Sequence, residues 1–198
     1  MKVKAWHTFY REEPSLKDLL FQLQVHCDLL ESILAESPRR VLEVGCGMGR
    51  LSLFLSYLGM EVTSVDNDEF VIARARRVNQ QFKGRVAFVL AEAFNLPFSN
   101  HHFDVAFSQG LLEHFSNADI RKLLSEQGRV AETVILSVPN ENYPNRDLGD
   151  ERLLSKQEWR RILDPYVVVE DKDYFPARLP RNLFVKRKIM YLSKLRLA

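Results

Sequence analysis

Three glycines at alternate positions, with an acidic residue just ahead of them, are the residues best suited to hold a ligand. They stand in the stretch Val41–Gly49, where Glu43 precedes Gly45, Gly47 and Gly49. An apolar run enters this stretch and a helical pattern leaves it, which indicates a buried strand, a tight turn and a helix N-terminus. Glycine tolerates positive φ and close approach of a ligand, and a helix N-terminus offers free N–H groups. The stretch therefore predicts a site for a nucleoside-bearing cofactor.

The spacing of the glycines separates two classes of cofactor. Dinucleotide enzymes use Gly-x-Gly-x-x-Gly, whose third glycine allows close packing around a pyrophosphate, but Arg50 stands at that position. The carboxylate of Glu43 would repel a pyrophosphate and attract an ammonium or sulfonium group, both present in S-adenosylmethionine (SAM). Asp66 ends the next predicted strand, about 20 residues after the first glycine, where a carboxylate can accept both ribose hydroxyls. These residues favour SAM, and a nicotinamide-dependent oxidoreductase is the weakest alternative.

From about residue 39 to residue 140, the sequence resembles the class I SAM-dependent methyltransferases, in particular the small-molecule branch. Five blocks carry the resemblance: Val41–Gly49 is similar to the first motif, Val62–Asp68 to the ribose motif, Leu90–Ala93 to the adenine-contacting block, Phe103–His114 to the fourth-strand motif, and Val134–Asn140 to the fifth. The adenine-contacting block departs from the family, because it reads Ala-Glu-Ala where Gly-Asp-Ala is commoner.

The resemblance implies a role for several residues of a cofactor site. Glu43 would lie near the methionine amino group of SAM, Asp66 would hold the ribose, Asn67 would lie beside the adenine, and Glu92 near its N6. Either Ser108 or Gln109 would lie near the methionine moiety. The other members of the predicted site are Gly45, Cys46, Gly47, Gly49 and Ala93. SAM would be the cofactor and S-adenosyl-L-homocysteine the product.

Strands that alternate with helices must position these residues. The pattern predicts strands near 41–44, 61–65, 85–90, 103–107, 133–138 and 166–169, with helices near 51–58, 70–82, 117–130 and 155–163. This order predicts an α/β fold in three layers, doubly wound around a mostly parallel sheet. The resemblance implies a seven-stranded, Rossmann-like sheet whose last strand is antiparallel. The end of the chain allows two structures, an edge strand at 183–185 or a basic amphipathic helix over 183–197.

Residues 1–38 are predicted to form an N-terminal helical segment ahead of a SAM-binding domain at 39–198. Leucines from Leu16 to Leu34 recur with helical spacing, and Ser15 is a plausible N-cap. Packing against the core is the simpler interpretation of this helix, but its position also allows a lid. In that case His7 and Tyr10 could reach the site. The loop at 139–153 is expected at the surface, and it would help to select the acceptor.

Charge and cysteine content set further expectations. The formal net charge is +2, but residues 174–198 form a basic segment without acidic residues. Its cations either are solvated or dock an anionic acceptor, RNA or a membrane surface; no nucleic-acid-binding motif accompanies them, so nucleic acid is not favoured. Only two cysteines occur, with no metal-type pairing, so neither a disulfide framework nor a bound metal is expected. With no signal peptide or membrane-length apolar run, a soluble cytoplasmic protein is expected.

His114 follows the fourth predicted strand and is the best candidate for a general base, because imidazole titrates near neutrality. The structural alternative, in which Glu113 and His114 cap or pack a helix start, carries more weight. No Asn-Pro-Pro-Tyr-like block follows that strand and no cysteine follows Cys46, which argues against exocyclic-amine and pyrimidine C5 methylation. The sequence predicts methyl transfer to a small-molecule acceptor by in-line displacement. An RNA or protein methyltransferase and a non-catalytic SAM-binding regulatory protein remain the alternatives.

Overall fold

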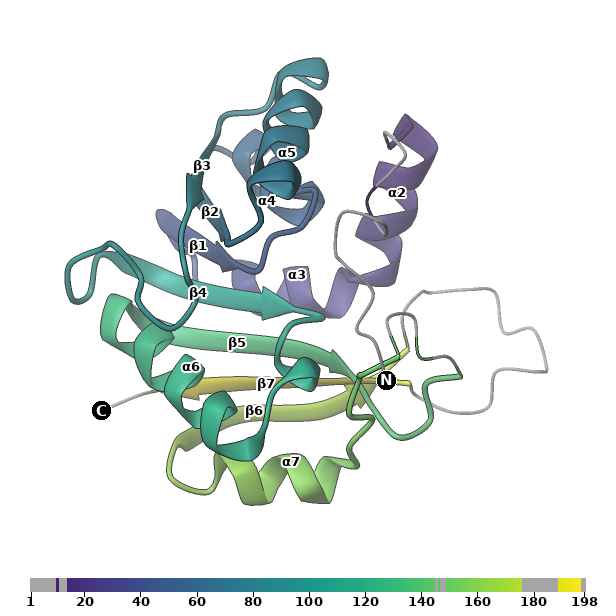
Figure 1. Ribbon diagram of the computed structural model, residues 1–198, viewed down its shortest axis with the longest axis vertical. Coiled ribbons are helices and arrows are strands. Elements are labelled where there is room, and N and C mark those ends of the chain that lie inside the picture. Colours follow the sequence, from purple (N-terminus) through teal and green to yellow (C-terminus); the bar gives the residue numbers. More distant parts are fainter. Residues whose placement is uncertain (1–9, 11–13, 145, 147–148, 176–188, 197–198) are drawn as a thin grey trace.

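One seven-stranded sheet forms the centre of the molecule in the computed structural model, which describes residues 10, 14–144, 146, 149–175 and 189–196. The strand order is β3-β2-β1-β4-β5-β7-β6 (Figure 1). The strands are β1 (Arg40–Val44), β2 (Glu61–Asp66), β3 (Val86–Leu90), β4 (Phe103–Gln109), β5 (Ala131–Pro139), β6 (Val167–Tyr174) and β7 (Met190–Arg196). Neighbours among β1–β5 are parallel, whereas β7 runs antiparallel between β5 and β6. The predicted doubly wound fold with an antiparallel last strand is confirmed.

Helices cover both faces of this sheet, because its central strands are apolar on both sides. They are α2 (Leu16–Val25), α3 (Cys27–Leu34), α4 (Arg50–Tyr57), α5 (Glu69–Gln81), the short 3-10 helix η1 (Leu112–His114), α6 (Asn117–Val130) and α7 (Lys156–Leu163). Along β5, Ile135 packs in a cluster with residues of α3, α4 and α5, whereas Val134 and Leu136 pack with α6 and α7. The glycine turn between β1 and α4 is therefore supported by a packed core.

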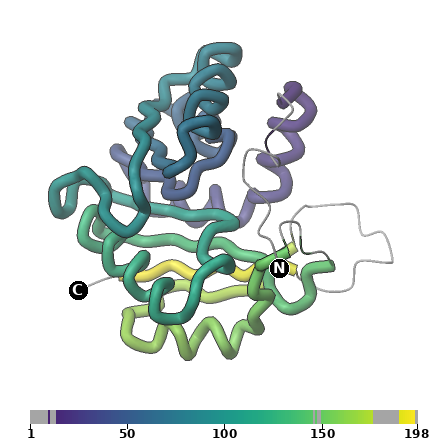
Figure 2. The backbone as a smooth tube through the Cα atoms, viewed as in Figure 1, coloured from purple at the N-terminus to yellow at the C-terminus, as the bar shows by residue number. Residues whose placement is uncertain are grey.

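The predicted N-terminal helix is divided in two at His26, whose φ of −107° and ψ of 23° interrupt the helical backbone. Helix α3 packs into the core through Leu29, Leu30 and Ile33, so the packing interpretation is right for this half. Helix α2 buries no residue, and Leu16 is 72% exposed. Figure 1 shows α2 standing off the sheet, toward the side at which β4 and β5 end, and the tube in Figure 2 follows the same path.

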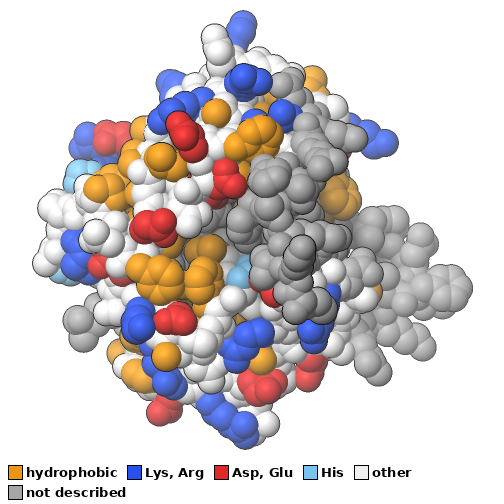
Figure 3. All heavy atoms as spheres, in the orientation of Figure 1, with side chains coloured by type: hydrophobic (Ala, Val, Ile, Leu, Met, Phe, Trp, Pro, Cys, Tyr) orange, Lys and Arg blue, Asp and Glu red, His pale blue; other side chains and the backbone are white. Residues whose placement is uncertain are grey.

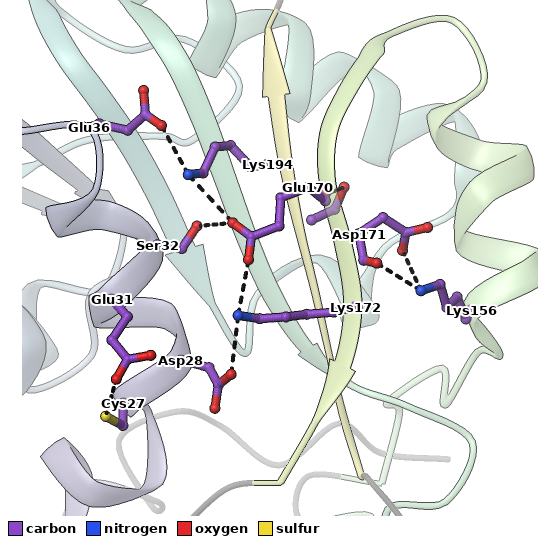
Figure 4. Close-up of polar contacts among 11 residues, drawn as sticks. Cys27, Asp28, Glu31, Ser32, Glu36, Lys156, Glu170, Asp171, Lys172 and Lys194 are labelled. Carbon is purple, nitrogen blue, oxygen red and sulfur yellow. Dashed lines mark hydrogen bonds and ion pairs between the residues drawn. The ribbon is translucent and has the colours of Figure 1, made fainter.

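The end of the chain is an interior strand, because β7 pairs on both of its edges. The alternative of a helix over 183–197 is therefore wrong for residues 190–196, while 183–188, including the expected edge strand, lie outside the described residues. The ammonium group of Lys194 is buried on β7 and contacts Glu36 at 2.9 Å and Glu170 at 3.4 Å (Figure 4). Arg196 also pairs with Glu36, at 2.6 Å. Two cations of the basic segment thus stabilise the packing of the 27–36 region on the sheet.

The segment that follows β5 is more buried than its composition predicts. Residues 139–153 were expected at the surface, but Asn140 and Glu151 are only 2% and 6% exposed. Asn140 forms an isolated bridge with Leu154, which returns this segment to the end of the sheet. Within the part of the chain that the structure describes, no helix is long and apolar enough to span a membrane.

Candidate functional site

The turn between β1 and α4 requires its glycines. Gly45, Gly47 and Gly49 have φ values of +72°, +51° and +64°, in the left-handed region that disfavours other residues. The N–H groups of Gly45 and Cys46 both donate to the carbonyl of Val65, at 2.9 and 3.0 Å, which ties the turn to β2. A Cβ on Gly45 would lie 2.8 Å from the Leu111 side chain. The turn is therefore fixed from two sides before any ligand binds.

Asp66 at the end of β2 is held by the same turn. Its Oδ2 accepts a hydrogen bond from the N–H of Gly47 at 3.0 Å, and its Oδ1 accepts from the N–H of Asp68 at 3.1 Å. Burial raises the pKa of this carboxyl above its ordinary value, although both backbone N–H groups lower it. Two backbone donors thus fix the orientation of a carboxylate that has further acceptor capacity.

A cavity of about 280 Å³, here called the smaller cavity, adjoins Asp66. Its wall includes Gly45, Asn67, Glu92 and Ala93, all predicted members of the cofactor site. The Asn67 side chain donates to Glu92 Oε2 at 3.2 Å. Apolar side chains form the rest of the wall, notably Phe94, Leu111 and Phe115. Figure 3 shows hydrophobic side chains gathered in the middle of this face of the molecule, with a histidine beside them and acidic groups around them.

A second cavity of about 400 Å³, the larger cavity, lies on the other side of the turn. Cys46 lines it, as do Phe21 and His26 from the N-terminal helices and Tyr143 and Glu151 from the segment after β5. The two cavities share four wall residues, namely Tyr10, Gln109, Gly110 and His114. A ligand in either cavity can therefore contact these four shared residues.

Glu43 faces the larger cavity from β1 and is almost fully buried. Ser52 donates to it at 2.5 Å, and Ser64 donates to Ser52 at 2.7 Å. Burial raises the pKa of Glu43 to about 8, and the nearby charge of Asp66 also raises it. Arg50 lines the same cavity, and its Nε is buried without a hydrogen-bond partner. The cavity thus offers an acidic and a basic group to a ligand that carries both charges.

His114 ends η1, on the wall common to both cavities. Its Nδ1 lies 2.8 Å from Asp150 Oδ1, and its side chain is 9% exposed. Of the structural alternatives for Glu113 and His114, capping is wrong, because Ser116 caps α6 through the N–H of Asp119. Glu113 is buried just ahead of this helix, which fits the packing alternative. No motif in the sequence indicates Asp150, which lies 36 residues further along the chain.

Three predicted site residues line neither cavity. Gly47 and Gly49 contribute to the turn through their positive φ angles. Ser108 is buried, whereas its neighbour Gln109 lines both cavities, because successive side chains of a strand point to opposite faces. Of the two alternatives for the methionine moiety, the structure places only Gln109 at a cavity.

Sequence reasoning gave little or no weight to several wall residues. Tyr10 is expected at the site only if the N-terminal helix forms a lid, but its buried phenol lies against Gly47, and a Cβ on that glycine would collide with it. The sequence motif identifies Arg50 only as the residue that replaces a third glycine, although Arg50 faces the larger cavity. Glu151 also lines the larger cavity, but it belongs to no sequence motif that could have identified it. These residues are brought together by the tertiary fold, so spacing along the chain carries no signal for them.

Comparison with known proteins agrees with this geometry. Residues 41–133 match the family model described as a methyltransferase domain. A probable S-adenosyl-L-methionine-dependent methyltransferase, TehB of Haemophilus influenzae, is 49% identical over 49 residues, which are 25% of this chain and 17% of that protein. Ajmaline N-methyltransferase of Rauvolfia serpentina is 27% identical over 135 residues, or 65% of this chain and 44% of the relative.

A solved structure shares the fold along almost the whole chain. Magnesium protoporphyrin IX methyltransferase from Synechocystis PCC 6803, crystallised with SAM, superposes with a TM-score of 0.69 at 16% identity, covering 98% of this chain and 89% of the other. Residues 41–133 thus match a methyltransferase domain, and the chain shares its fold with a methyltransferase that was crystallised with SAM. The chain spans less than half of the length of the two relatives named above.

Proposed function

We propose that this protein transfers a methyl group from SAM to a small-molecule acceptor that binds in the larger cavity. The observation that carries the proposal is the pair of adjoining cavities that meet at Gln109 and His114. One cavity has the groups that a nucleoside needs, and the other has room for a second molecule. The similarity to ajmaline N-methyltransferase supports an acceptor of low molecular weight.

The residues around the glycine turn fit SAM. Asp66 would accept the ribose hydroxyls, while Asn67, Glu92 and Ala93 would surround the adenine in the smaller cavity. Glu43 and Arg50 would hold the ammonium and carboxylate groups of the methionine end, because both face the larger cavity. When bound, SAM supplies an activated methyl group on a sulfonium. Gly45 and Cys46 would lie against it with their backbone.

Catalysis of this reaction consists mainly of positioning the acceptor and excluding water. His114 is the catalytic residue that we propose, because its place on the shared wall lets it contact an acceptor atom beside the methyl group. Asp150 would fix the orientation of the imidazole through the 2.8 Å contact at Nδ1. Phe21 and Val25 line the larger cavity from α2, which supports a lid role for this helix.

Calorimetric titration of SAM and of S-adenosylhomocysteine into the folded protein tests the cofactor site directly. We expect saturable binding of both at one site per chain, followed by methyl transfer when an acceptor panel is supplied with labelled SAM. Absence of saturable heat for either compound would overturn the proposal. SAM binding without turnover on a broad panel would favour a regulatory protein instead.

Methylation of RNA or protein is the second candidate, and it depends on the basic segment for docking. Lys194 and Arg196 are engaged in internal ion pairs, which removes two of its seven cations from that role. The other five, Arg178, Arg181, Lys186, Arg187 and Lys188, lie outside the described residues. Strong, salt-sensitive RNA binding would favour this candidate.

A further inference from the structure

A cluster of one imidazole and two carboxylates lies where the two cavities meet: Glu151 lines the larger cavity, Asp150 the smaller one and His114 both. His114, Asp150 and Glu151 each offer one ligand atom, and these atoms lie within 4.8 Å of one another. The Nδ1 of His114 is 2.8 Å from Asp150 Oδ1. Around a six-coordinate ion with bonds of about 2.1 Å, adjacent ligand atoms lie about 3.0 Å apart and opposite ones about 4.2 Å. The cluster thus needs only a small contraction to surround such an ion.

Arg152 fixes the segment that carries Asp150 and Glu151 against η1, which carries His114. Its backbone N–H donates to the carbonyl of Glu113 at 2.9 Å, and its guanidinium donates to Asn117 Oδ1 at 2.6 Å and to the carbonyl of Phe115. These contacts fasten the segment before α7 onto η1 and the start of α6. Asp150 immediately precedes this fastening point, so its place beside His114 is built into the fold.

Glu113 gives an independent indication that a ligand belongs here. Its side chain is 3% exposed and lines the same cavity as His114 and Glu151. Its Oε2 is buried and has no hydrogen-bond partner. A carboxylate oxygen in this position costs free energy unless a donor or a cation reaches it. An ion between η1 and the 149–152 segment would satisfy this requirement.

We propose that His114, Asp150 and Glu151 form a binding site for a divalent cation beside the acceptor position, with the buried carboxyl group of Glu113 close by in the wall of the larger cavity. Carboxylate oxygens with a single imidazole suit a hard or borderline ion such as Mg²⁺ or Mn²⁺. This assignment replaces the earlier expectation that no metal is bound. His114 then acts as a ligand rather than as a base, because the nitrogen lone pair that would accept a proton is donated to the cation.

The ion also defines a class of acceptor, an inference that rests on the proposed function. A cation in the wall of the larger cavity would bind an acceptor that bears a hydroxyl group, and it would favour loss of the hydroxyl proton to water. The oxygen lone pair then forms the new bond to the methyl carbon, and the electron pair of the breaking carbon–sulfur bond stays on sulfur. The acceptor class is therefore an alcohol, phenol or enol.

Calorimetry with Mn²⁺ alone tests the site in the chelator-treated protein. We expect saturable binding of one ion per chain, and Asp150→Asn and Glu151→Gln should each weaken it at least tenfold. Glu141→Gln is the matched control, because Glu141 is an exposed carboxylate of the same segment, and it should leave Mn²⁺ affinity unchanged. Thermal unfolding of each variant confirms that the chain is folded.

A parallel titration of SAM, with and without chelator, separates this proposal from the proposed function. SAM should bind in both conditions, because the residues proposed for it are distinct from the metal ligands. Folded wild-type protein without saturable Mn²⁺ binding would overturn the cation site while leaving SAM binding intact. Equal Mn²⁺ affinity in wild type, Asp150→Asn and Glu151→Gln would also overturn it.

Discussion

The two cavities are built in different ways. The smaller cavity is formed mainly by residues that directly follow β1, β2, β3 and β4, so short motifs along the chain already define it. The larger cavity is assembled from the N-terminal helices, the glycine turn, η1, the segment after β5 and the start of β7. One cavity is thus a local property of the chain and the other a property of the tertiary fold. The difference explains why the class of reaction can be inferred more readily than the acceptor.

Asp66→Ala should produce the largest loss of SAM affinity, and the loss should arise in the smaller cavity alone. Loss of the charged acceptor for the ribose hydroxyls should cost about 1–3 kcal/mol of SAM binding, or about 5- to 150-fold in Kd. Glu69→Gln, a substitution in the exposed first turn of α5, is the matched control. Calorimetry with SAM measures both. An unchanged Kd for Asp66→Ala would show that this carboxylate does not hold the ribose.

Glu43, which faces the larger cavity, should make the free energy of unfolding depend on pH. Its pKa of about 8 in the folded state exceeds the ordinary value of 4.5 because of burial, and Asp66 adds to the shift; Tyr10 and Cys46 also lie within its field. The folded state therefore retains a proton that the unfolded state loses above pH 4.5. This contribution to stability is full below pH 4.5 and is lost as pH rises through 8, by about 2 kcal/mol between pH 6 and 8.

Glu43→Gln should remove this part of the pH dependence, which chemical denaturation at several pH values can measure. The difference between wild type and variant isolates Glu43 from other titrating groups. SAM affinity should show the opposite trend in the wild type, rising over the same pH range because the ammonium of SAM favours the ionised carboxylate. Parallel stability curves for the two proteins would contradict the assignment.

Tyr10→Ala should break the separation between the cavities, because Tyr10 lines both. We expect roughly a tenfold loss of SAM affinity and a similar rise in the KM of the acceptor, since each ligand loses one face of a buried ring. Tyr10→Phe retains the ring and should behave nearly as the wild type. A change in only one of the two constants would show that Tyr10 belongs to one cavity alone.

Phe21→Ala should give the smallest effect, limited to the larger cavity. The side chain is 54% exposed on α2, so its removal should raise the KM of the acceptor only about two- to fivefold. Leu20→Ala provides the control, because Leu20 is similarly exposed on the same helix but does not line the cavity. Steady-state kinetics with both variants at saturating SAM tests whether α2 acts as a lid. Equal KM values for the two variants would argue against that role.

The contrast between the cavities also shows which parts of the structure could be predicted from the sequence. The parallel sheet, the glycine turn and the boundaries of α6 follow from periodicity and capping, which are local. The helix break at His26 could not be predicted, because no glycine or proline stands at that point. The place of β7 could not be predicted either, because it depends on pairing with β5 and β6. Asp150 and Glu151 acquire their positions from Arg152, whose contacts span 35 to 39 residues, so no short motif contains them.

A crystal structure with S-adenosylhomocysteine would test the central claim most directly. The two-cavity account predicts the adenine between Asn67 and Glu92, the ribose hydroxyls on Asp66, and the sulfur facing the larger cavity near Gln109. An adenosine moiety bound in the larger cavity instead, with Asp66 free of contact to the ribose, would contradict it.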